Sequence, residues 1–169
     1  MRRARDRAVI WLIVFYALVG FTVELNWLLF YRTFPLRHDF LGRMWRFYAQ
    51  GDRGYYDLVS GFETGLEGFH LLVTLPLLLV LLWGVLRGSI WRFPLQLCVG
   101  SYCCYSVLLY LLAKHVTGYA EMPRHDAGSF LILYLANLPW LVGMGWLALD
   151  AAREISRVFH RIEGTAHAI

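Results

Sequence analysis

Charged residues are scarce in this sequence, and lysine is almost absent. Asp, Glu, Lys and Arg make up 17% of the 169 residues, and Lys114 is the only lysine, so the net charge of +4 comes from arginine. The basic residues are divided among short segments and do not gather on one polar face, which argues against a nucleic-acid partner. We expect them to meet the anionic headgroups of membrane lipids instead.

Several functional motifs are missing as well. Cysteine occurs three times, as Cys98, Cys103 and Cys104, inside one apolar run and without the spacing of a metal site. We therefore interpret the cysteines as small buried side chains and predict no metal site. The sequence also contains no phosphate-binding loop and no redox-cofactor motif, so we expect a function that needs no cofactor.

Hydrophobic residues, by contrast, are abundant. They make up 59% of the chain, whereas soluble domains have about 45–50%. Four apolar stretches are long enough to cross a hydrocarbon core, which needs about 20 helical residues. They cover approximately residues 8–30, 58–86, 93–113 and 128–151. The sequence therefore predicts an all-α, multi-pass integral membrane protein, with one domain over residues 1–169 built as a four-helix transmembrane bundle.

The connection between the first two stretches contains a short amphipathic segment. Apolar and basic residues alternate in groups there: Phe40, Leu41, Met44, Trp45, Phe47 and Tyr48 with Arg43 and Arg46. This pattern is typical of a helix that lies in the membrane interface. We expect such an interfacial helix between the first and second spans.

The placement of arginine indicates the orientation in the membrane. An even number of spans puts both termini on one side, where nine arginines lie in short segments beside the helix ends, against seven basic residues in the opposite loops. We predict cytoplasmic termini, because basic residues favour that side. A cleaved signal peptide is the alternative for the N-terminus, but the apolar run continues past Glu24 to Phe30 without a small-residue cleavage site.

Polar residues inside the predicted spans are candidates for a functional site, because an ionisable group in lipid is costly unless it is sheltered. They are Glu24 in the first span, Glu63, Glu67 and His70 on one face of the second, Tyr102, Tyr105 and Ser106 in the third, and Asn137 and Trp140 in the fourth. With a rise of about 1.5 Å per helical residue, all four spans bring a polar group to one layer. The sequence therefore predicts a buried polar site in the outer half of the bilayer.

Each of these groups also has a plain structural explanation. Glu24 can be a protonated carboxyl bonded to a backbone carbonyl, and Glu67 with His70 can be a hydrogen-bonded pair that joins two helices. Glu63 lies nearer the interface and can be a solvated residue at the rim. Asn137 and the tyrosines can serve helix packing alone. The agreement of four spans on one depth favours the functional interpretation.

Three segments carry a family resemblance. They are MWRFYAQGDR at residues 44–53 followed by Glu67 in the next span, LQL at residues 95–97, and NLPWL at residues 137–141. Together they resemble the emopamil-binding protein family, also called the EXPERA domain, which includes the sterol Δ8–Δ7 isomerases and the sigma-2 receptor. The resemblance extends from about Gly20 to Arg153 and is greater to the isomerase branch, and we expect a four-helix domain without the extra first helix of the eukaryotic isomerases.

The resemblance implies roles for particular residues. Glu24 matches the acid of the family's His-x-x-x-Glu pair, Glu67 the glutamate of the next span, and Asn137 with Trp140 the Asn-x-x-Trp pair. The sequence departs from the family at two positions, since the histidine of His-x-x-x-Glu falls on Gly20, and a threonine of the family falls on His70. We infer that the imidazole has moved from the first span to the second across the same cavity.

Double-bond migration is a chemistry that such residues can perform. It requires a proton donor, a carbocation and a base at a neighbouring carbon. A carboxyl buried in apolar surroundings keeps its proton near neutrality and can donate it, and the face of Trp140 can stabilise the cation by about 2 kcal/mol. The leading hypothesis is a membrane-embedded isomerase of a sterol or isoprenoid-like lipid. Its predicted site residues are Glu24, Glu67 and His70 for catalysis and Asn137, Trp140, Tyr105, Glu63 and Tyr102 for substrate binding.

Two other functions remain open at this point. The same groups would serve a cyclase that starts by protonating a terpenoid or polyketide-like substrate. A protein that only binds sterols or other amphiphiles is the second alternative. In each case the expected partners are a hydrophobic small molecule and membrane lipids, and the oligomeric state, a homodimer included, is left open.

Overall fold

A computed structural model describes residues 2–166 of the chain, and the side chains of residues 4–163. Helices and the turns between them account for this whole part of the chain. The α-helices are α1 (Arg2–Val19), α2 (Leu25–Phe30), α3 (Phe40–Tyr48), α4 (Gly61–Phe69), α5 (Leu75–Leu86), α6 (Arg92–Val116) and α7 (Ala127–Ala166). Between them lie the π-helical segments η1 (Gly20–Glu24) and η4 (His70–Thr74) and the 3₁₀ segments η2 (Tyr31–Leu36) and η3 (Arg53–Tyr55).

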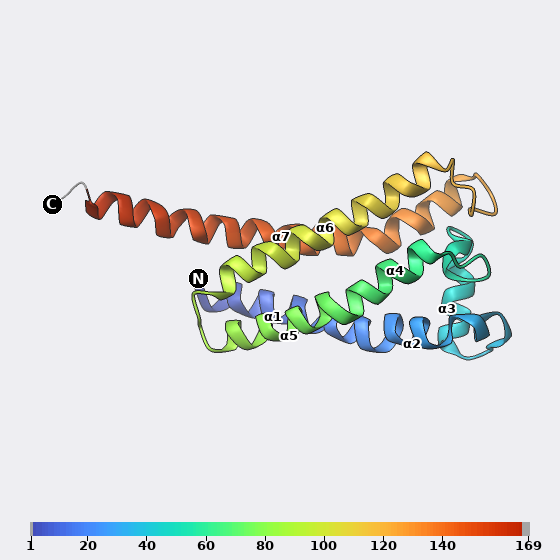
Figure 1. Cartoon of the computed structure of the whole chain (residues 1–169), viewed down its shortest axis with the longest axis horizontal. Coiled ribbons are helices and arrows are strands. Elements are labelled where there is room, and N and C mark those ends of the chain that lie inside the picture. Colours follow the sequence, from blue (N-terminus) through green and yellow to red (C-terminus); the bar gives the residue numbers. More distant parts are fainter. Residues whose placement is uncertain (1, 167–169) are drawn as a thin grey trace.

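The helices form four continuous spans in the described part of the chain. Ala4–Leu36, Gly61–Leu86, Arg92–Val116 and Ala127–Glu163 are each long and apolar enough to cross a membrane. The prediction of an all-α, four-helix membrane bundle is therefore confirmed, and the short helix α3 is present between the first two spans. Figure 1 shows α6 running beside α7 and α1 beside α5, with α3 across the end of the bundle away from the N-terminus.

Local hydrogen bonds set several of the helix boundaries. The carboxylate of Asp39 accepts from the Gly42 amide at the start of α3, and the Ser60 hydroxyl accepts from the Phe62 amide at the start of α4. Such N-caps satisfy amides that have no partner inside the helix. Helix α6 ends at Val116, and the φ of 62° at Gly118 allows the Tyr119 amide to bond back to the Lys114 carbonyl at 2.8 Å. Glycine adopts this left-handed conformation without steric cost.

The first and the last span are longer than the apolar pattern indicates. Hydropathy predicts that the last helix ends near Ala151, but α7 continues to Ala166 and projects beyond the other helices, at the end that holds the N-terminus (Figure 1). Hydropathy marks where a helix leaves lipid and not where its hydrogen bonding stops. Ion pairs of Arg5 with Asp150 and Glu154 join α1 to this part of α7.

Two clusters of buried side chains hold the bundle together on either side of its middle. The half near the termini packs aliphatic residues and Tyr16, for example Ile13, Leu78 and Met144. The opposite half is largely aromatic and contains Trp27, Phe34, Trp45, Tyr55 and Tyr110. Trp140 and Tyr102 of the predicted layer pack against the first of these clusters.

Helices α6 and α7 approach each other closely at a glycine. A Cβ atom on Gly100 would lie 2.6 Å from the Met144 carbonyl oxygen and 2.8 Å from the Ala148 amide nitrogen. Both neighbours are backbone atoms, which cannot move aside as a flexible side chain can. Small residues that permit such contacts are a usual means of joining membrane helices.

We therefore expect Gly100→Ala to lower the free energy of unfolding by about 1–3 kcal/mol, the usual cost of overpacking. Gly65→Ala is the matched control, because a Cβ at Gly65 meets no atom within 4 Å and alanine favours the helix over glycine. Thermal unfolding in detergent measures both variants. Equal midpoints for the two would contradict the close approach of α6 to α7.

Candidate active site

Two π-helical turns face each other in the first and second spans. In η1 the Leu25 amide bonds to the Gly20 carbonyl, and in η4 the Leu75 amide bonds to the His70 carbonyl, so each turn contains one extra residue. Pro76 follows directly and has no amide hydrogen to continue the α-helical pattern. Such turns are frequent at functional sites because they change the direction of side chains. Here they bring Glu24 and His70 together, since η1 and η4 are in contact.

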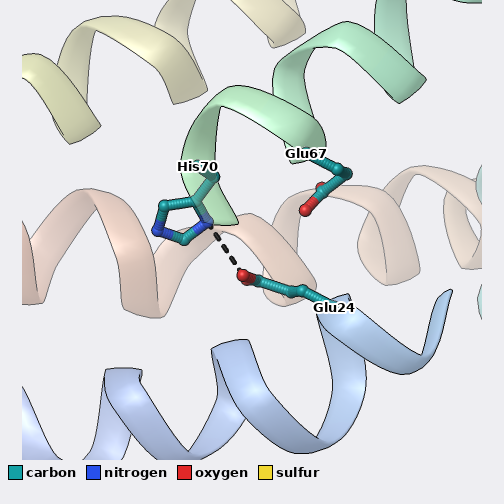
Figure 2. Close-up of side chains that lie close together, drawn as sticks. All are labelled: Glu24, Glu67 and His70. Carbon is teal, nitrogen blue, oxygen red and sulfur yellow. Dashed lines mark ion pairs between the residues drawn. The ribbon is translucent and has the colours of Figure 1, made fainter. Parts of the chain in front are cut away.

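Glu24, Glu67 and His70 form the centre of the site (Figure 2). The Glu24 Oε2 atom lies 2.9 Å from His70 Nδ1, as an ion pair when the imidazole is protonated. Each of the three residues offers one ligand atom, and these atoms lie within 4.8 Å of one another. A proton can therefore move between any two of these groups directly or through one water molecule.

Tyr55 orients the carboxylate of Glu67. Its hydroxyl donates to Glu67 Oε1 at 2.8 Å, and burial raises the pKa of Tyr55 well above the ordinary tyrosine value, so that the hydroxyl stays a donor. The backbone carbonyl of Tyr55 in turn accepts from Trp27 Nε1 at 2.8 Å. The other carboxylate oxygen of Glu67, Oε2, is buried without a hydrogen-bond partner among the described residues. This oxygen is available to a substrate.

Trp140 forms an aromatic wall beside the imidazole. Its ring lies 4.9 Å from that of His70 in an edge-to-face arrangement. Tyr16 stacks on Trp140 at 4.3 Å and donates its hydroxyl to the Pro139 carbonyl at 2.6 Å. These contacts fix the indole in one orientation, as an aromatic group that is to stabilise a cation must be fixed.

Two cavities that share several lining residues surround these side chains. The inner one has a volume of about 80 Å³ and is bordered by Glu24, Glu67, His70, Tyr102, Asn137 and Trp140, among others. The second, of about 600 Å³, runs between the first span, α3 and α7, and shares Glu24, Tyr55, Glu67, Asn137 and Trp140 with the inner one. Ligand cavities commonly have about 300–1,000 Å³, so the larger space suits a lipid-sized molecule.

The structure thus places most of the predicted site residues at one cavity. Asn137 donates to the Leu133 carbonyl at 2.8 Å and to the Tyr48 hydroxyl at 3.4 Å, while Tyr102 packs against Phe69. Tyr105 has to be corrected, because it is 61% exposed and borders neither cavity. Cys103 faces the inner cavity, and Tyr105 is about 200° away from it around the helix.

Glu63 also lies elsewhere than predicted. It is one turn nearer the start of α4 than Glu67, borders neither cavity, and pairs with Lys114 at 2.8 Å. Its carboxylate therefore belongs to a separate buried ion cluster. Sequence could not indicate this pairing, because Lys114 is 51 residues away along the chain.

Several residues around the site escaped the sequence-based prediction. Tyr16 borders neither cavity but stacks on Trp140, and Tyr55 lies in a connection without helical periodicity. The sequence assigned Tyr48 only to the interfacial helix and gave Tyr110 no role, and only the folded chain brings their hydroxyls together, at 3.1 Å. Spacing along a sequence cannot reveal a contact between separate helices.

The donor set at the centre would also suit a divalent cation. One imidazole and two carboxylates within 4.8 Å of one another can coordinate a metal ion. In the second acidic group, Asp52, Glu63 and Glu121, the ammonium of Lys114 already pairs with all three carboxylates. The expectation of a metal-free active site therefore stays a prediction.

Comparisons with known proteins agree with the resemblance found in the sequence. The family described as EXPERA (EXPanded EBP superfamily) matches residues 40–151. A relative from Rattus norvegicus named 3-beta-hydroxysteroid-Delta(8),Delta(7)-isomerase is 30% identical over 133 residues, which are 78% of this chain and 57% of the relative. A relative of the same name from Cavia porcellus is 29% identical over 153 residues, 89% of this chain and 65% of the relative.

The chain thus spans less than two thirds of the length of either of these relatives. The family match covers α3 to α7 up to Ala151, and so includes Glu67, His70, Asn137 and Trp140. This chain belongs to the EXPERA family.

Proposed function

We propose that the protein is a membrane-embedded isomerase that shifts a carbon–carbon double bond in a sterol-like lipid. The observation that carries the proposal is the meeting of Glu24, Glu67 and His70 within 4.8 Å at a buried cavity beside Trp140. The name of the relatives, 3-beta-hydroxysteroid-Delta(8),Delta(7)-isomerase, supports a sterol as the substrate.

In the proposed reaction, Glu67 is the acid and His70 the base. The proton of Glu67 adds to one alkene carbon, whose π electrons form the new C–H bond and leave a cation at the neighbouring carbon. His70 then removes a proton from the carbon beyond, and that C–H electron pair becomes the new double bond. The site is ready for another turnover once His70 has lost this proton and Glu67 has regained one, and the short distance between the two residues allows a direct return.

The surroundings of the site support this chemistry. Glu24 lies 2.9 Å from Nδ1 of His70, so the charge of the imidazolium that forms is neutralised at once. The indole of Trp140 can stabilise the carbocation by about 2 kcal/mol in a site without bulk water. Exclusion of water also prevents hydration of the cation.

The alternatives make different demands on the cavity. A protein that only binds an amphiphile is best served by a closed, dry layer, whereas here the inner cavity shares Glu24, Glu67 and Trp140 with the larger one. The cyclase hypothesis uses the same groups and differs in its product. Incubation of the purified protein with a Δ8 3β-hydroxysterol separates these functions, because the isomerase yields the Δ7 sterol, a cyclase acts only on another substrate, and a binding protein returns the sterol unchanged.

We expect Glu67→Gln to reduce this conversion at least 100-fold, because the amide keeps the size and the bond to Tyr55 but cannot donate a proton to carbon. The thermal midpoint in detergent should stay within about 2 °C of wild type, since surface and isosteric changes cost little. Glu163→Gln, at an exposed carboxylate far from the cavity, is the control. Full activity of Glu67→Gln would refute the acid role.

His70 and Gly20 lie on either side of the same carboxylate. A Cβ on Gly20 would be 3.6 Å from Glu24 Oε2, the oxygen that pairs with His70. We expect His70→Thr to lower turnover about 100-fold, as loss of a general base does, and the double variant His70→Thr/Gly20→His to recover part of that loss. An unchanged rate in His70→Thr would show that the imidazole only packs. If the double variant turns over the sterol no faster than His70→Thr alone, the idea that an imidazole can serve the same carboxylate from either span is refuted.

The metal-free expectation has its own measurement. Treatment of the purified protein with EDTA or 1,10-phenanthroline should leave the sterol conversion unchanged, because the proposed proton transfers need only side chains. Metal analysis should find no stoichiometric ion. Loss of activity that added Zn²⁺ restores would instead assign Glu24, Glu67 and His70 as metal ligands.

A further inference from the structure

A line of hydrogen-bonded groups leads from the cavity toward the end of the bundle away from the termini. The Tyr48 and Tyr110 hydroxyls lie 3.1 Å apart, and Tyr110 donates in turn to Asp52 Oδ2. Tyr110 borders the inner cavity, and Tyr48 borders the larger one. The line therefore begins in the space that holds Glu67 and ends at a carboxylate outside the membrane-spanning helices.

Asp52 belongs to a buried cluster of unequal charge. Lys114, the only lysine of the sequence, pairs with Asp52 at 3.0 Å, with Glu63 at 2.8 Å and with Glu121. Asp52 and Glu63 are each only 1% exposed. All three carboxylates share the one ammonium, and one oxygen of each lies within 4.8 Å of those of the other two. The cluster thus offers neighbouring carboxylate oxygens that can accept a proton and pass it on.

Glu121 connects this cluster to water. Its side chain is 27% exposed, against 7% for Lys114 and 1% for Asp52. It lies in the connection between α6 and α7, outside the membrane-spanning helices. The backbone of such a non-helical connection has to form hydrogen bonds with water or with other parts of the protein. A proton on Asp52 can therefore reach the solvent through neighbouring carboxylates.

The opposite end of the line reaches the acid–base residues through the cavity. Tyr48, Tyr55 and Glu67 all border the larger cavity of about 600 Å³. One water molecule needs about 10–15 Å³ of such volume and two or more polar partners, so the cavity can hold a bridging water. Burial raises the pKa of Tyr48 above the ordinary tyrosine value, which keeps its hydroxyl able to accept one proton while donating another.

We propose that Tyr48 and Tyr110 conduct protons between the acid–base site and the aqueous surface, by way of Asp52 and the Lys114 cluster. A proton that arrives at the Tyr48 oxygen releases the Tyr48 hydroxyl proton to Tyr110, which releases its own to the Asp52 carboxylate. Each tyrosine ends neutral, and rotation of the hydroxyls resets the line. The reverse sequence delivers a proton to the cavity.

This path rests on the proposed function for its purpose. Isomerisation leaves Glu67 without its proton and His70 with an additional one. If the cavity is isolated from water, the site is restored only when the proton on His70 moves back to Glu67. With a path to the solvent, Glu67 can take up a proton and His70 can release one independently of each other. It also exchanges the proton that enters the product for one from water.

The first test does not require turnover. Infrared spectroscopy follows the carboxylic C=O band of Glu67, assigned by its absence in Glu67→Gln, after transfer to D₂O at a pD low enough for the band to appear. We expect Tyr48→Phe and Tyr110→Phe each to slow the deuterium shift of this band at least tenfold. Tyr134→Phe is the matched control, because it removes one hydroxyl of an exposed pair with Tyr119, 2.9 Å apart, off the path.

Exchange at the wild-type rate in both phenylalanine variants would overturn the path and indicate that water enters by another route. Slowing in the control as well would overturn it too, since the effect would then not depend on the line. If Tyr110→Phe does not fold, judged by its thermal midpoint, Tyr48→Phe decides the outcome alone.

The second test uses the Δ8 sterol in D₂O. We expect the wild-type product to carry one solvent deuteron, and the product of Tyr110→Phe to carry mainly protium recycled from the substrate. Equal deuterium contents would overturn the path while leaving the isomerase intact. If wild type converts no sterol, the proposed function fails, and the infrared measurement still decides whether the path exists.

Discussion

The contact between Glu24 and His70 is the interaction on which the site depends. A charged group inside a membrane span is expensive, and a partner on another span that can neutralise the charge removes most of that expense. Both residues belong to π-helical turns, so the backbone of each span is altered where the pair forms. The pair joins the first two spans at the border of the inner cavity, and Glu67 and Trp140 line the same space.

Clusters of polar side chains occur at three levels along the bundle in the described part of the chain. The side chains are paired in a different way at each level. Near the termini, Arg5 pairs with Asp150 and Glu154 across α1 and α7. In the middle the acid–base residues border a cavity, with oxygens left available. At the far end Lys114 gathers three carboxylates from separate segments. The first and third levels close the ends of the bundle, and the middle one remains open to a ligand.

The two positions at which this sequence departs from the family pattern, Gly20 and His70, lie beside the same carboxylate. Both positions adjoin Glu24 Oε2, one at 3.6 Å from a Cβ that glycine lacks and the other at 2.9 Å from an imidazole nitrogen. An imidazole can therefore reach the same carboxylate from the first span or from the second. The glycine leaves open the space that a histidine of the first span would fill, so a substrate would meet a cavity of different shape.

Hydropathy and depth along the chain determined a large part of this protein. Four apolar stretches fixed the number of spans, because only a continuous hydrogen-bonded helix can cross lipid. The rise per residue fixed the common layer of Glu24, Glu67, His70, Asn137 and Trp140, because polar residues in spans of known direction have known depths.

Only the tertiary structure decided which residues meet within that layer. Tyr105 shares the predicted depth but faces away, and Glu63 shares a helix face with Glu67 but joins Lys114. Contacts between separate segments place Tyr48, Tyr55 and Tyr110 at the cavities and stack Tyr16 on Trp140. Helix rotation and the π-helical turns depend on packing between spans, and no spacing along a single chain contains that information.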